Sequence, residues 1–271
     1  MKAKTVVALL MAVIIAAAAA PIRGTNAVGM SYTPSRQYTA SKYYKRLSSI
    51  KPTGDQRLDI INVAASQIGY HEGDSLEELT GGNKAGASNY SEYCYWFGTQ
   101  VMGTGEGFYH PWCAMFVSWC ARQAGIPKSV VSNAAYARPD GANKSGGYGY
   151  FHVDYYSPSE YTPICGDLVF IDWEADGTWD HVGLVYYVNG DVVGTIEGNA
   201  EDGVRAREYS ISDPEIKAFG TPLYVAFTEG DVGSAVFSAR AEAARAISLM
   251  SQKAALLRAA LIDPEGTDPE G

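Results

Sequence analysis

The chain has 271 residues, of which 46% are hydrophobic and 19% are charged. This composition is typical of a globular protein and excludes a disordered chain or a collagen-like fibre. The formal net charge of -9 argues against nucleic acid as the main partner, because phosphate binding needs a concentrated basic surface.

The first 27 residues are predicted to be a secretory signal peptide. Lys2 and Lys4 form a basic start, an unbroken apolar run covers 6–20, and a more polar stretch follows. A membrane-spanning helix needs about 20 apolar residues, so a membrane anchor is the weaker interpretation and none is expected after signal removal. Loss of residues 1–27 removes Lys2, Lys4 and Arg23 but no acid, which leaves 18 bases, 30 acids and a net charge of -12.

The region after the signal is predicted to begin with an exposed leader and then a helix. Residues 28–52 are rich in serine and tyrosine and lack apolar periodicity, which favours an exposed leader. Thr53 and Gln56 have the spacing of a capping box, and apolar residues then recur at helical spacing until Gly69. A second helical stretch is predicted around 90–97.

The segment from Pro111 to Ala121 is apolar almost all round, which predicts a buried helix. Pro111 is expected in its first turn, and Gly125 marks its end. Residues 132–163 are rich in Gly, Pro, Ser and Tyr without periodicity and predict a long loop.

The remainder of the domain is predicted to be β-structure. Five short β-rich runs are separated by turn residues: Asp167–Trp173, His181–Val188, Asp191–Ile196, Val204–Ile211 and Lys217–Val225. Helices followed by an antiparallel sheet define an α+β fold. The domain is expected to span 53–228, followed by an alanine-rich helix over 229–262 and an Asp-Pro-Glu-Gly tail over 263–271 that cannot form a core.

Cys113 is the candidate nucleophile. It lies in the first turn of the predicted buried helix, where the helix dipole favours the thiolate. A buried structural cysteine is the alternative, because free cysteine is among the most buried residue types. His181 begins a strand, and Glu197 and Asn199 end the strand predicted to pair with it. A cysteine nucleophile needs an imidazole to take its proton and a carboxylate or amide to orient that imidazole.

The pairing register decides whether these side chains meet. A two-residue loop at Asn189-Gly190 would turn Glu197 and Asn199 away from His181. A three-residue loop with a bulge at Gly190 would place His181 opposite Asn199, with Glu197 one step along the same face. We therefore predict the three-residue loop.

Four blocks of this sequence resemble the ordered motifs of CHAP domains, the cysteine- and histidine-dependent amidohydrolases and peptidases related to papain-like enzymes. The blocks are 112–120, 166–170, 180–185 and 195–199. The resemblance implies a papain-like fold, with N-terminal helices packed on a small antiparallel sheet. It also implies that Cys113 is the nucleophile, that His181 is general base and then acid, and that Glu197 and Asn199 are polar partners.

The resemblance further implies a secreted, cell-wall-associated enzyme that hydrolyses amide bonds of bacterial peptidoglycan. It would act as an N-acetylmuramoyl-L-alanine amidase or as an endopeptidase of the stem peptide or cross-bridge. A non-catalytic wall-binding or scaffold protein with this fold is the competing interpretation, because a fold can persist without its function. A secreted amidase acting on another amide is a third. Sequence leaves the oligomeric state open.

Three aromatic residues, Tyr109, Trp112 and Trp179, are expected to contribute to substrate binding because aromatic rings stack on sugars and peptides. The proposed chemistry requires no cofactor. A zinc site would have to use Cys113, Cys120, His110 and His181, which lack the usual ligand spacing. Calcium remains open in an acidic loop, although no EF-hand order is present: Glu72, Asp74, Glu77 and Glu78.

The remaining cysteines allow at most one disulfide. Cys113 and Cys120 are two helical turns apart, and about 10 Å between their Cα atoms is beyond disulfide reach. Cys94, Cys120 and Cys165 are therefore left for a single bridge in an oxidising compartment. The sequence does not choose the pair.

Overall fold

The structure is a computed structural model that describes residues 32–53, 55–126, 153–177, 179–222 and 224. The predicted signal peptide over 1–27, the alanine-rich helix over 229–262 and the tail over 263–271 lie outside the described residues.

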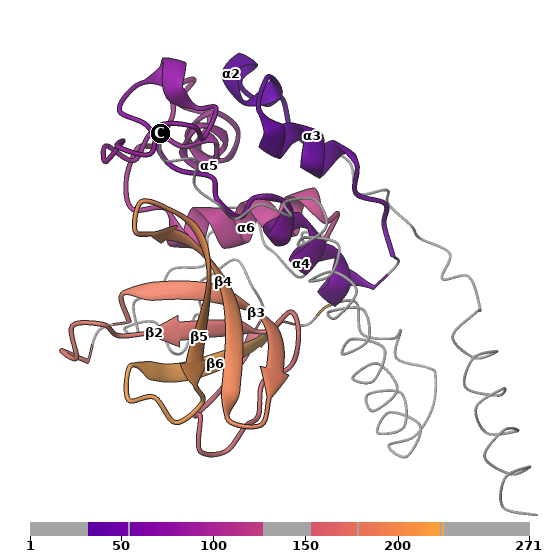
Figure 1. The fold of residues 1–271 in the computed structure, drawn as a ribbon, viewed down its shortest axis with the longest axis vertical. Coiled ribbons are helices and arrows are strands. Elements are labelled where there is room, and N and C mark those ends of the chain that lie inside the picture. The colour runs from indigo at the N-terminus through magenta and orange to yellow at the C-terminus, as the bar shows by residue number, and fades with distance from the viewer. Residues whose placement is uncertain (1–31, 54, 127–152, 178, 223, 225–271) are drawn as a thin grey trace, which may run out of the picture.

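The helices come first in the chain and gather on one side of the sheet (Figure 1). They are α2 (Arg36–Thr39), α3 (Lys42–Ser48), α4 (Gln56–Ser66), the 3-10 turn η1 (Leu76–Glu78), α5 (Glu92–Trp96), the π-helical η2 (Phe97–Met102) and α6 (Cys113–Gln123). Every residue of α6 except Arg122 is buried, which confirms the helix predicted to be apolar all round.

The strands follow and form one antiparallel sheet. They are β1 (Val153–Tyr156), β2 (Leu168–Ile171), β3 (His181–Asn189), β4 (Val192–Ala200), β5 (Gly203–Ser210) and β6 (Ile216–Pro222), in the spatial order β1-β6-β2-β3-β4-β5. Helices followed by an antiparallel sheet confirm the predicted α+β class. β1 lies in the segment predicted to be a loop, because its β-structure depends on pairing with the distant β6 and not on local pattern.

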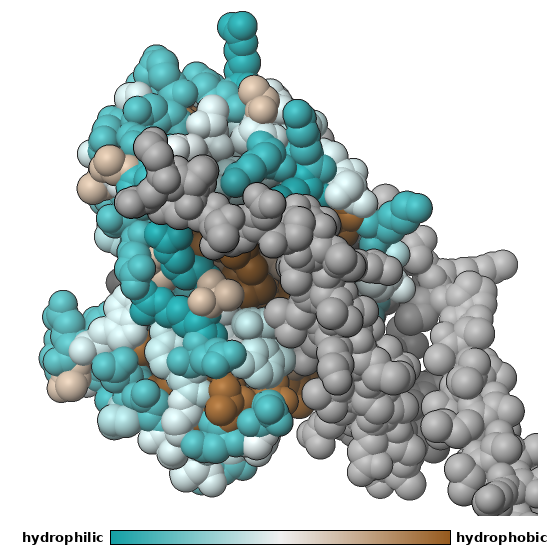
Figure 2. All heavy atoms as spheres, in the orientation of Figure 1, coloured by the Kyte–Doolittle hydropathy of each residue, from teal (hydrophilic) through white to brown (hydrophobic). Residues whose placement is uncertain are grey.

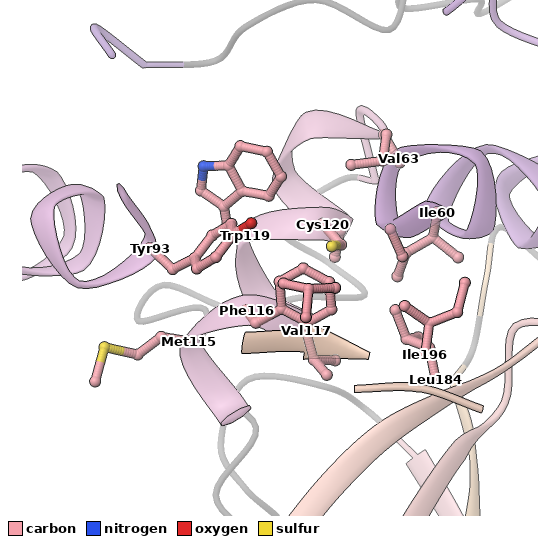
Figure 3. Close-up of a cluster of buried hydrophobic side chains, with 14 of the residues drawn as sticks. Ile60, Val63, Tyr93, Met115, Phe116, Val117, Trp119, Cys120, Leu184 and Ile196 are labelled. Atoms are coloured by element: carbon pink, nitrogen blue, oxygen red, sulfur yellow. The ribbon is translucent and has the colours of Figure 1, made fainter. Parts of the chain in front are cut away.

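The main core lies between α6 and the sheet. α6 packs on β3 and β4, and Phe116 of α6, Leu184 of β3 and Ile196 of β4 are buried there (Figure 3). Gly198 permits this close approach, because a Cβ at that position would lie 2.4 Å from the Cβ of Phe116. A smaller cluster covers the other face of the sheet: Val169, Ile171, Val185, Val193, Ile216 and Phe219.

On the face shown in Figure 2, hydrophilic side chains cover most of the described surface, and hydrophobic atoms reach it between the helices and the sheet. Within the part of the chain that the structure describes, no helix combines the length and apolar character that crossing a membrane requires.

The first described residues do not form an exposed leader, contrary to the sequence prediction. Ser35 and Ser41 cap α2 and α3 by accepting hydrogen bonds from backbone N–H groups. Tyr38, Tyr43 and Leu47 are buried and join the main core. The prediction failed because these helices are too short to show a period and because their apolar area is largely supplied by tyrosine rings.

Two predicted helix starts also move. Asp55, not Thr53, is the N-cap of α4, because its carboxylate accepts a hydrogen bond from the N–H of Arg57. Thr53 instead binds the carboxylate of Asp59. α6 begins at Cys113 with Trp112 as its N-cap, so Pro111 precedes the helix and is not in its first turn.

Candidate active site

Cys113 is the first residue of α6, at the side of the main core that meets the sheet. The N–H groups in the first turn of a helix have no intrahelical acceptor, so the positive end of the helix dipole lies at this thiol. The side chain is largely shielded, with 6% of the residue exposed. The fold therefore places a sulfur nucleophile where negative charge is stabilised.

Trp112 anchors the start of this helix. Its Nε1 donates a hydrogen bond to Oε2 of Glu72 at 2.6 Å, and its ring stacks on Tyr93 with 5.0 Å between centroids. The prediction that Trp112 binds substrate is wrong, because this residue is 0% exposed. These contacts hold Trp112 in the protein interior and so fix the start of the helix that carries Cys113.

His181 and Glu197 meet on neighbouring strands and are both buried. The Nε2 atom of His181 is 3.0 Å from Oε2 of Glu197. The carboxylate lies off the line of the N–H bond, so the contact is an ion pair and not a straight hydrogen bond. The imidazole also interacts with the side chain of Cys113, which raises the pKa of His181. Three of the four residues predicted from sequence are thus brought together.

The charges of this pair support each other. Burial alone would lower the pKa of His181, but its contacts with Cys113 and Glu197 raise it to about 9. Burial alone would raise the pKa of Glu197, but the contact with His181 and the hydroxyl of Thr195 lower it below its ordinary value. At neutral pH the pair is an imidazolium beside a carboxylate.

Glu197 has protein donors on both of its oxygen atoms. Oε1 accepts a hydrogen bond from the hydroxyl of Thr195 at 2.5 Å, and the hydroxyl of Tyr209 donates to Oε2 at 3.4 Å. Sequence reasoning did not assign either donor, because Thr195 and Tyr209 lie at strand positions that carry no motif of their own. Their only sequence signal is that they share the period-two face of Glu197.

The register at the catalytic end of the hairpin is the predicted one, but the loop is not. Gly183 pairs with Glu197, which puts His181 and Glu197 on one face as expected. The loop has two residues, since Asn189 pairs with Val192. The register changes further along, where Tyr186 is an extra residue between the paired Val185 and Tyr187. The bulge was therefore predicted at the wrong place.

Asn199 does not join the site. The pairing of β4 with β5 shifts between Glu197 and Ala200, and Asn199 adopts a left-handed φ of 58° in this irregularity. Within the described residues its side chain makes no hydrogen bond to His181 or Cys113. Of the two predicted polar partners, Glu197 is the one that contacts the imidazole.

Two more residues contact the His181–Glu197 pair. A Cβ on Gly183 would lie 2.7 Å from Cγ of Glu197, so glycine is required for the carboxylate to occupy this position. Trp173 stacks on His181, with 4.1 Å between ring centroids and 24° between planes. Because Trp173 is 37% exposed, its indole forms the outer cover of the imidazole.

The other two predicted substrate residues are half-buried and already in contact with other rings. Tyr109 stacks on Tyr90, with 4.0 Å between centroids. Trp179 packs against Tyr155 and Phe170. Their roles toward a substrate stay predictions.

The carboxylates of the acidic loop bind protein donors. Asp74 accepts hydrogen bonds from the N–H of Ala87 and the hydroxyl of Ser88. Glu78 accepts from the N–H of Asp74 and from Asn83. Across the ranges that the structure describes, no three His, Cys, Asp or Glu side chains are grouped to hold a metal ion.

The other cysteines differ from Cys113. All four cysteines are buried. Burial raises the pKa of Cys94 to about 12 and that of Cys120 well above its ordinary value. These two side chains remain thiols at neutral pH, whereas Cys113 lies beside an imidazole.

A helix begins with Cys113 and packs on an antiparallel sheet in which a strand begins with His181, which is the order of elements that the four sequence blocks implied. Residues 103–199 match the family model described as CHAP domain, which confirms the resemblance. This segment contains Cys113, His181 and Glu197.

Solved structures with similarity to the chain include two of Ly7917. One, "The crystal structure of Ly7917 with the hydrolyzing product of MDP", is 18% identical with a TM-score of 0.31 and covers 41% of this chain. The other, "The crystal structure of Ly7917", is 17% identical with a TM-score of 0.31 and covers 41% of this chain. The chain spans about half the length of each Ly7917 chain, 53%. No curated protein sequence matched the chain.

Proposed function

We propose that this protein is a cysteine-dependent hydrolase that cleaves amide bonds of bacterial peptidoglycan. The observation that carries the proposal is the contact of His181 with both Cys113 and Glu197. This set combines a nucleophile, a proton acceptor and an orienting carboxylate, which are the groups that acyl transfer requires.

The reaction has two steps. In the first, the Cys113 sulfur attacks the amide carbonyl carbon, and the imidazolium of His181 gives a proton to the leaving amine as the C–N bond breaks. In the second, the neutral imidazole takes a proton from water, whose oxygen attacks the thioester. The carboxylic acid is released and the thiolate–imidazolium pair is restored. Glu197 stays ionised throughout and stabilises the imidazolium.

The start of α6 supplies one donor for the tetrahedral oxyanion. The backbone N–H of Cys113 has no acceptor within the helix and lies next to the reacting sulfur. Helix N-termini stabilise developing negative charge by such free N–H groups and by the helix dipole.

The family match supports a wall amide as the substrate class. The basic start and apolar run of residues 1–20 support export to the cell wall. The proposal covers both an N-acetylmuramoyl-L-alanine amidase and an endopeptidase of stems or cross-bridges. Tyr109 and Trp179 are the proposed substrate contacts, and no cofactor is invoked.

Mass spectrometry of purified peptidoglycan after incubation with the chain from residue 28 tests this proposal. Whole stem peptides released from the sugar identify an amidase, and shortened stems or opened bridges identify an endopeptidase. Cys113→Ala is the inactive reference, and Cys120→Ala is its matched control on the same helix. If the unaltered chain and Cys113→Ala both leave the peptidoglycan intact, the protein is a scaffold or acts on another amide.

A further inference from the structure

The ion pair of His181 and Glu197 has an outer layer on β5, beyond the segment that matches the family model. Arg207 and Tyr209 project from the same face of β5 because they are two residues apart. Arg207 pairs across the strands with Thr195, which binds Glu197. β5 therefore brings a cation and a phenol to the back of the catalytic carboxylate.

Arg207 contacts the site at two places. Its guanidinium lies 5.6 Å from the ring centroid of Trp173, the indole that stacks on His181. It also lies on the same face of β5 as Tyr209, whose hydroxyl lies 3.4 Å from Oε2 of Glu197, and the Arg207 charge interacts with this phenol. One side chain thus acts on both the cover of the imidazole and a donor to the carboxylate.

The guanidinium is itself held in place. Its Nη2 atom is 2.9 Å from Oε1 of Glu201, with 28% of the Arg207 side chain and 73% of the Glu201 side chain exposed. Exposed ion pairs of this kind contribute little to stability, so removal of Arg207 is expected to leave the fold intact. An effect of Arg207 on the site can therefore be measured in a folded protein.

We propose that Arg207 is a positioning residue for the catalytic pair: it holds Tyr209 against the Glu197 carboxylate and supports the Trp173 ring on His181. The inference rests on the proposed function, because it assigns Arg207 a role in the reaction of Cys113. Its positive charge also favours the ionised form of Glu197, whose pKa it helps to lower.

The titratable and charged groups that face Glu197 come from three strands. His181 faces it from β3, Thr195 from its own strand, and Arg207 and Tyr209 from β5. Arg205 of β5 is the cross-strand partner of Glu197, and its guanidinium binds the backbone carbonyl of Glu201. Cys113 on α6 is coupled to it through His181. Loss of the Arg207 charge should therefore raise the pKa of Glu197. At low pH, Glu197 would then be protonated more readily, and the imidazolium of His181 would lose its countercharge.

The test is the pH dependence of Cys113 alkylation by iodoacetamide, followed by mass spectrometry of the peptide that contains Cys113. Arg207→Gln should move the acidic limb of this curve upward by about 0.5 pH unit, an effect typical of one nearby charge. Arg205→Gln is the matched control: Arg205 lies on the same face of the same strand and pairs with Glu197, but its guanidinium is held at Glu201 and does not contact Tyr209 or Trp173. It should move the limb by less than about 0.2 unit.

Two further variants sharpen the test. Arg207→Lys keeps the charge and should recover at least half of the shift, and Tyr209→Phe should shift the limb in the same direction by less. Identical curves for Arg207→Gln and Arg205→Gln, or no recovery in Arg207→Lys, would overturn the proposal.

The alkylation curve needs no peptidoglycan, so it separates this inference from the proposed function. If Cys113 alkylates as expected but wall fragments are not cleaved, the proposed function fails while the comparison of Arg207 with Arg205 still holds. If a soluble muropeptide is cleaved, Arg207→Gln should lower kcat about fivefold with KM nearly unchanged, as expected for lost positioning.

Discussion

Glu92 on the helical side and Glu197 in the sheet are both 0% exposed, yet their carboxyl groups have opposite pKa shifts. Glu92 accepts hydrogen bonds from the Tyr32 hydroxyl and from the N–H and hydroxyl of Ser35. These neutral donors do not offset burial, which raises the pKa of Glu92 to about 7. Glu197 lies against His181, and its pKa is lowered.

Burial alone therefore does not set the charge of a carboxyl group in this protein. With three neutral donors the pKa of Glu92 stays at about 7, whereas one imidazolium lowers the pKa of Glu197. The first group ties residues 32–35 to α5, and the second binds His181, the proposed catalytic base. The two carboxyl groups are thus distinguished by whether a partner carries a positive charge.

The largest difference between the two carboxyl groups is expected when each is replaced by an amide. Glu197→Gln should lower amide hydrolysis at least about 100-fold, because the imidazolium loses its countercharge. Glu92→Gln should retain activity within about twofold, since that group does not contact the site. Initial rates on a soluble muropeptide measure both, and equal losses in the two variants would remove the distinction.

The pH dependence of stability tests the Glu92 side. A carboxyl whose pKa is raised in the folded state, from 4.5 to about 7, holds its proton more tightly there than in the unfolded chain. Its contribution is present below pH 4.5 and is lost as pH rises through 7, which amounts to about 3 kcal/mol. Urea unfolding from pH 4 to 8 measures this slope. Glu92→Gln should flatten it, and an unchanged slope would contradict the assignment.

Substitution of Gly183 tests how tightly the Glu197 side chain is packed. Gly183→Ala should destabilise the protein by about 2 kcal/mol, because the added Cβ would meet the Glu197 side chain at 2.7 Å. Activity should fall as well, since the carboxylate must move away from His181. Thermal unfolding and initial rates together check this prediction. A variant that loses stability but keeps full activity would show that the Glu197 position is not critical.

The smallest predicted effect is a shift in one titration. In the unaltered protein the imidazole of His181 should titrate near pH 9, and in Glu197→Gln its pKa should fall by at least about one unit. NMR of histidine side chains follows both titrations, with Glu92→Gln as the control. This raised pKa also stabilises the fold below about pH 6.5, and that stability is lost as pH rises through 9. A His181 that titrates alike in both variants would contradict the ion pair.

Sequence predicted the parts of the site that depend on local pattern. The apolar helix that begins with Cys113 and the strand that begins with His181 were both predicted, and their order gave the α+β class. The choice between Glu197 and Asn199 depended on irregular strand pairing, which has no local signal. The buried tyrosines of residues 32–50 were missed for a related reason, because only tertiary contacts reveal that they are core residues.

The extra residue at Tyr186 divides the β3–β4 hairpin into two parts, and the pairing register of β3 with β4 differs between them. The turn at Gly190-Asp191 lies beyond this point, and Gly190 and Asp191 are both exposed. Loop grafting can exploit this separation. A peptide tag or wall-binding module inserted at the turn should leave the alignment of His181 with Glu197 unchanged, which makes this tip a natural fusion point for retargeted variants.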